Sequence, residues 1–142
     1  MTSILFGPAK EGFLKGEISL STATIKTSLV RSYTPNAAHK FVSEVTGAGG
    51  VIASTAPALT SKTTTLGVFD AADITFTAVT TNANNHYLLI YQSSAVTGGA
   101  DVAASAQRII AWIDTGTNLP AVPNGGDVNI VWDNSANKIF AL

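Results

Sequence analysis

Two short segments that are apolar at successive positions constrain the fold more than any other feature of the chain. They read YLLIY at 87–91 and IIAWI at 109–113, and polar residues flank both. A strand with one face in water alternates apolar and polar residues, whereas a strand covered on both faces is apolar throughout. The two segments therefore predict central strands of a sheet, with protein packed on both of its faces.

Further strands follow from alternating patterns and β-branched residues. They are expected within 23–33, 62–80, 86–94, 106–116, 128–132 and 138–142. The segment at 62–80 predicts a hairpin whose arms, 66–68 and 74–78, are joined by a turn at 70–73, where aspartates can accept backbone N–H bonds. Residues 48–61 mix small residues with one proline and predict a loop with at most an edge strand.

Two short helices are expected in the N-terminal third. The first has Pro8 in its first turn and stops at Gly16. The second is capped by Asn36 or Thr34 and ends at Gly47. With six to eight strands and frequent turn signals, residues 1–142 predict a single, mainly β domain. We expect a β-sandwich or a small, jelly-roll-like barrel, with one or two short helices in the N-terminal third.

Composition excludes several classes of function. The 8 basic and 9 acidic residues are scattered singly and give a net charge of -1, whereas nucleic-acid binding needs a clustered basic face. Cysteine is absent, which excludes disulfides, thiolate metal sites and a cysteine nucleophile. No apolar run exceeds five residues, far fewer than the ~20 that span a membrane. The N-terminal MTSILFGPAK lacks the basic start and apolar run of a signal peptide. We expect a soluble protein that binds neither nucleic acid nor membranes.

Acidic and amide side chains gather in the C-terminal stretch IDTGTNLPAVPNGGDVNIVWDNSANKIFAL. A calcium loop needs a denser run of ligands than Asp114, Asn118 and Asn124 provide, and these residue types also form turns. We interpret the stretch as turn-forming, with a bound cation as the lesser alternative. His39 and His86 lie apart with no carboxylate motif beside either, which favours surface or capping roles.

Catalytic motifs are missing from the sequence as well. No serine has the G-x-S-x-G context of a hydrolase nucleophile, and no glycine run matches a phosphate-binding loop. We therefore assign no catalytic, cofactor-binding or metal-binding residues and no cofactor, and we expect a protein that is not an enzyme.

Four aromatic residues are candidates for contact with a partner or ligand: Tyr87, Tyr91, Trp112 and Trp132. Tyrosine and tryptophan anchor protein cores and interfaces, and their rings can also stack on sugars. Core or interface packing is the favoured interpretation, and a sugar-binding platform is the alternative.

The order of the segments resembles a known family. The run FLKGEISLSTATIKTSLVRSYTPNAAHKFVSEV is similar to the opening of a group of small tailed-bacteriophage structural proteins, most like head decoration, or cement, proteins. In that group a helix ends in a DG-x-I-x-L turn, and a strand then leads to Y-T-P and an F-x-s-D/E-V segment. The pieces DAADITFTAVTTN, YLLIYQSS, AWIDTG and NGGDVNIVWDNSANKIFAL resemble the rest of its pattern in the same order.

The resemblance implies a non-enzymatic virion protein on the outer surface of the capsid, where it would stabilise the head by bridging capsid subunits. Its partners would be the major capsid protein and copies of itself, as a dimer or trimer. A tail or baseplate structural protein is one alternative. A carbohydrate-binding virion module is another, and it requires exposed rings at Trp112 and Trp132.

Overall fold

The computed structural model describes residues 3–142 and is organised around one five-stranded antiparallel sheet. Its strands, in spatial order, are β1 (Ile4–Leu5), β9 (Arg108–Ile113), β6 (Tyr87–Gln92), β2 (Ile25–Arg31) and β3 (Val51–Thr55). The two segments that are apolar at successive positions are β6 and β9, and they pair with each other inside the sheet. The prediction of two central strands is confirmed.

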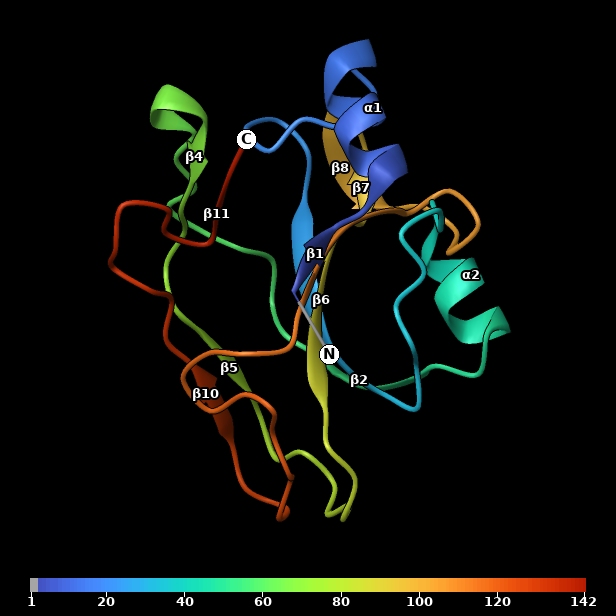
Figure 1. Cartoon of the computed structure of the whole chain (residues 1–142), viewed down its shortest axis with the longest axis vertical. Coiled ribbons are helices and arrows are strands. Elements are labelled where there is room, and N and C mark those ends of the chain that lie inside the picture. Colours follow the sequence, from blue (N-terminus) through green and yellow to red (C-terminus); the bar gives the residue numbers. More distant parts are fainter. Residues whose placement is uncertain (1–2) are drawn as a thin grey trace.

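Three two-stranded ribbons and two helices surround this sheet. The ribbons are β4 (Val68–Phe69) with β11 (Phe140–Ala141), β5 (Ile74–Phe76) with β10 (Val128–Ile130), and β7 (Ser94–Ala95) with β8 (Gly98–Asp101). The helices are α1 (Gly7–Lys15) and α2 (Val42–Gly47), and η1 (Thr65–Gly67) is a short turn with a non-helical residue, Leu66, at its centre. Figure 1 places the first two ribbons and α2 on opposite sides of the central strands.

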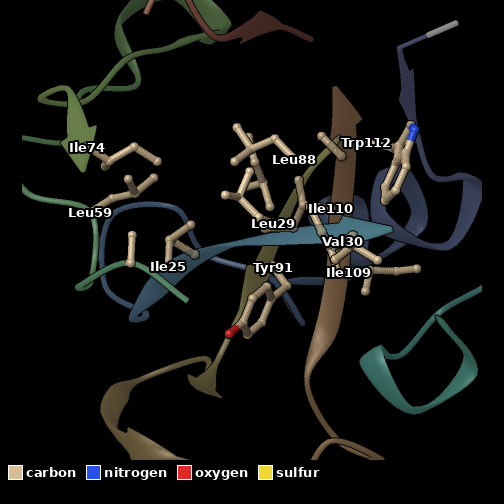
Figure 2. Close-up of a cluster of buried hydrophobic side chains, with 14 of the residues drawn as sticks. Ile25, Leu29, Val30, Leu59, Ile74, Leu88, Tyr91, Ile109, Ile110 and Trp112 are labelled. Carbon is tan, nitrogen blue, oxygen red and sulfur yellow. The ribbon is translucent and has the colours of Figure 1, made fainter. Parts of the chain in front are cut away.

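This arrangement explains why β6 and β9 are apolar at every position. Leu29 of β2 lies opposite Leu88 of β6, and Figure 2 shows both on the side that faces Ile74 of β5. Tyr91 projects from the other side of the sheet, the side on which α2 buries Val45. Removing one such leucine or isoleucine side chain from water stabilises the fold by about 1.5–3 kcal/mol.

The mainly β class with two short helices is confirmed, whereas the barrel alternative is wrong. Among the described strands, β1 and β3 form the two edges of the sheet and do not pair, so the sheet stays open. The described chain has eleven strands rather than six to eight. Several of them are only two residues long, too short to show a periodic pattern.

The predicted hairpin at 62–80 is also wrong. Its arms form β4 and β5, but β4 pairs with β11 and β5 with β10, so both partners come from the C-terminal part of the chain. The ring of Phe69 packs 5.3 Å from that of Phe140, and the carboxylate of Asp73 accepts the backbone N–H of Trp132 at 2.9 Å. Contacts with residues far away in the sequence are therefore more stable than the local hairpin that the alternation of apolar and polar residues predicted.

The first helix agrees with its prediction. It ends at Gly16, whose φ of 73° is left-handed and suits glycine. The second helix begins later than predicted, at Val42. Asn36 instead closes a local turn by accepting the N–H of Ala38 at 3.0 Å. Glu44 caps the start of α2. Its carboxylate accepts hydrogen bonds from the backbone N–H groups of the two residues just before the helix, at 2.5 and 2.8 Å.

The first two residues of β8 offer a matched test of how this strand packs on the segment before β2. Gly98 and Gly99 have left-handed φ values of 94° and 97°, but a Cβ on Gly98 would lie 2.6 Å from the carbonyl oxygen of Thr22, whereas one on Gly99 would meet nothing within 4 Å. We expect Gly99→Ala to cost about 1 kcal/mol of unfolding free energy through backbone strain. Gly98→Ala should cost roughly 1–3 kcal/mol more because of the clash.

Thermal unfolding monitored by circular dichroism measures the difference. At about 2–4 °C per kcal/mol for a domain of this size, Gly98→Ala should have the clearly lower midpoint. Equal midpoints for the two variants would contradict the packing of Gly98 on Thr22, just before β2.

Candidate functional site

A cavity of about 380 Å³ lies where the C-terminal stretch meets the end of β9. Ile113 and Ile130 contribute apolar walls together with Trp132, and Asp133 and Lys138 bring opposite charges to the same lining. The sequence analysis singled out this stretch for its acidic and amide side chains. Its local hydrogen bonds show what those side chains do.

The acidic and amide groups mainly hold backbone. Asp133 accepts the N–H of Ser135 at 3.1 Å, and Asn124 accepts that of Gly126 at 3.0 Å. Asp127 accepts the N–H of Ala78 at 2.8 Å, which ties the C-terminal stretch to the loop after β5. The turn-forming interpretation is confirmed. Within residues 3–142, no three histidine, aspartate or glutamate side chains gather in a group that could hold a metal ion.

Two of these aspartates differ in their surroundings. Asp114 is buried and accepts hydrogen bonds from the hydroxyls of Ser3 and Thr115 at 2.9 and 2.8 Å, which fastens the N-terminal segment to the end of β9. Asp133 is exposed, and the hydroxyl of Ser135 lowers the pKa of its carboxyl. A carboxylate with a lowered pKa is ionised at neutral pH and unsuited to act as a general acid.

The four aromatic candidates do not form a platform. Trp112 is fully buried and packs edge-on against Tyr33 at 5.2 Å between ring centroids. Its ring also lies 5.6 Å from that of the partly buried Tyr87. Tyr91 and Trp132 are 6% and 7% exposed, and the indole N–H of Trp132 donates to a backbone carbonyl at 2.9 Å. The core interpretation is confirmed, and the rings offer no coplanar exposed faces to a sugar.

The two histidines are not brought together. His39 is partly buried, and its Nδ1 lies 2.9 Å from the hydroxyl of Tyr33. His86 is fully buried beside β6, and its Nδ1 lies 2.8 Å from the carbonyl oxygen of Asn84. The expected surface position is therefore wrong for His86, whereas its bond to a backbone carbonyl two residues earlier agrees with the capping alternative.

An ion pair between a buried and an exposed side chain was missed by sequence reasoning. The guanidinium of Arg108, 8% exposed, contacts the carboxylate of Glu17, 44% exposed, and donates to the carbonyl oxygen of Pro8 at 2.7 Å. This hydrogen bond from Arg108 lowers the pKa of Glu17. The pair fastens both ends of α1 to the start of β9. Its members are 91 positions apart, so no local pattern reveals it.

Two surfaces with exposed apolar side chains remain open to partners. The edge strand β3 pairs with β2 on one side only within the described chain, and its Val51 and Ile52 are 38% and 36% exposed. The second surface is the turn at Leu66, which is 96% exposed beside the 62% exposed Leu142. Large exposed apolar side chains that lie close together mark contact sites more often than isolated ones.

Comparison with known proteins adds no relative: no family model, no curated protein and no solved structure matches this chain. The resemblance to phage decoration proteins rests on the sequence motifs alone. None of the helices in residues 3–142 has the length and apolar character needed to cross a membrane.

The Arg108–Glu17 pair predicts a specific dependence of stability on pH. Because the pKa of Glu17 is lowered from its ordinary value of 4.5, the pair stabilises the fold fully above that value, and its contribution disappears as the pH falls through the lowered pKa. Glu17→Gln should lower the thermal midpoint at pH 7. The difference in thermal midpoint between this variant and the unsubstituted protein should disappear in acid.

Glu11→Gln is the matched control, because Glu11 pairs with Lys15 on the surface, where both side chains are more than half exposed. Exposed pairs contribute little to stability, so this variant should unfold close to the unsubstituted protein. If the difference in thermal midpoint between Glu17→Gln and the unsubstituted protein stays the same in acid, the ion pair is not the cause of that difference.

Proposed function

We propose that this chain is a structural protein of a tailed-bacteriophage virion, which decorates the outer capsid surface and stabilises the head by bridging neighbouring capsid subunits. The observation that carries the proposal is the ordered set of decoration-protein motifs, which runs from residue 13 to residue 142. In this role the protein performs no chemistry. Its work is mechanical, because many weak contacts on one lattice add up through avidity.

The edge strand β3 supports an assembly role. Sheet edges present unpaired N–H and C=O groups, and soluble proteins usually protect them with charges, prolines or covering segments. Residues 48–61 contain no charged side chain, and no proline interrupts Val51–Thr55. An uncharged edge of this kind can add a strand from another chain through backbone hydrogen bonds.

A second copy of the chain is the partner we propose for this edge. Two β3 strands related by a two-fold axis would pair antiparallel and join two five-stranded sheets into one. The identical strands carry no charge and so do not repel each other. A dimer formed in this way also doubles the number of capsid contacts that each particle can make.

A tail or baseplate location is the runner-up, since it requires the same assembly surfaces and differs only in where the protein binds. A carbohydrate-binding role has less support, because Trp112 and Trp132 are both in the core.

Binding to capsids that lack the protein tests the proposed location directly. Purified protein should bind them at a fixed stoichiometry, and cryo-electron microscopy should show it on the outer lattice. If the protein does not bind the capsid but binds tails or baseplates, the capsid role is contradicted and the tail or baseplate role replaces it.

A charge on the edge strand tests the dimer. Ile52→Lys would bring two ammonium groups close to the two-fold axis, and like charges across an interface cost several kcal/mol. Self-association should weaken by roughly 100-fold, measured by analytical ultracentrifugation, which corresponds to about 2.7 kcal/mol.

Val122→Lys is the control, because it adds the same charge at a residue that is 56% exposed in a loop. This variant should associate like the unsubstituted protein. Unchanged association of Ile52→Lys would contradict pairing through β3.

A further inference from the structure

The turn that carries Leu66 has an unusual conformation for its sequence. Leu66 adopts φ 54° and ψ 34°, and Gly67 follows with φ 77°. The N–H of Val68 donates to the carbonyl oxygen of Thr65, so the two left-handed residues occupy the centre of a four-residue turn. A turn with positive φ at both central positions favours asparagine, aspartate or glycine at the first of them.

Leucine at this position destabilises the free protein in two ways. A left-handed conformation costs a residue with a Cβ about 1–2 kcal/mol. The side chain is also 96% exposed, so it gains no burial in return. Backbone strain of this kind clusters at functional sites, and here the strained residue holds a large apolar side chain in solvent.

The turn stands on a rigid base. Phe69 directly below it is 1% exposed and packs against Phe140. The N–H of Leu142 donates to the carbonyl oxygen of Gly67 at 2.9 Å, so a second exposed leucine lies beside the turn. Figure 1 shows the turn at one end of the long axis of the molecule, with the C-terminus near it. These backbone and ring contacts hold both leucines on the outside of the protein.

We propose that Leu66 is the anchor side chain that binds this end of the protein to the capsid, by entering an uncharged apolar pocket on the outer face of the shell, with Leu142 at the rim of the contact. This inference rests on the proposed function and names the contact that carries it. The turn is convex, so its partner must be concave. Residues 63–69 carry no charged side chain, so the pocket that receives Leu66 is apolar. A single buried side chain of this kind supplies much of the binding energy of many interfaces.

Replacing Leu66 by asparagine separates binding from folding. Asparagine accepts the left-handed conformation, so Leu66→Asn should unfold at the same temperature as the unsubstituted protein or higher. Its affinity for capsids that lack the protein should nevertheless fall at least about 30-fold, the loss expected for an interface anchor. Leu66→Gly, which also tolerates this φ, removes the same side chain and should show the same loss. Val122→Asn, at an exposed apolar residue in a loop, is the control and should bind normally.

The outcomes separate the inference from the function on which it rests. If the unsubstituted protein binds capsids and both Leu66 variants bind equally well, the inference is overturned and the proposed function stands. If the unsubstituted protein does not bind capsids, both are overturned. If the Leu66 variants instead lose self-association in the absence of capsids, the side chain anchors a second copy, which also overturns the inference.

Discussion

The pairing of β6 with β9 is the constraint on which the rest of the structure depends. Leu88, Leu89 and Ile90 on one strand and Ile109 and Ile110 on the other are all fully buried. Two adjacent strands with no polar face are stable only if both sides of the sheet are covered. The ribbons β4–β11 and β5–β10 cover one side and α2 covers the other (Figure 1). The Arg108–Glu17 pair and the bonds around Asp114 then fasten the N-terminal segment along β9. The peripheral elements are best understood as cover for this pair of strands.

The sequence predicted those parts of the fold whose physical cause is local. The central strands, the helix stop at Gly16 and the turn-forming role of Asp133 follow from residue type and spacing. The ribbons could not be predicted, because alternation identifies a strand but not its partner. Arg108 gave no signal either, since its partner is distant in the chain. For the candidate surfaces, the uncharged run at 48–61 was visible in the sequence. The left-handed conformation of Leu66 was not, because leucine is not a residue from which that conformation is expected.

The two open surfaces suit different tasks in an assembly. A sheet edge offers backbone groups in a fixed geometry, so it binds an extended strand and imposes a precise orientation on the partner. A projecting leucine offers only apolar area and shape, so it binds a pocket and tolerates small rotations around it. Residues 48–61 and 63–69 carry no charged side chain, so the contacts of β3 and Leu66 themselves should depend little on salt. In the proposed capsid role, contacts of this kind would persist through changes of ionic conditions.

The late position of β10 and β11 in the chain has a consequence for synthesis. Both pair with strands that the ribosome makes much earlier, β5 and β4. Until residues 128–141 emerge, the apolar side of β2 and β6 lacks part of its cover. At about 5–20 residues per second, this interval lasts on the order of seconds, far longer than the collapse of a small chain. Nascent chains crowded on one message would expose these sheets to one another, so translation speed and chaperone capacity should limit how much native protein a cell accumulates.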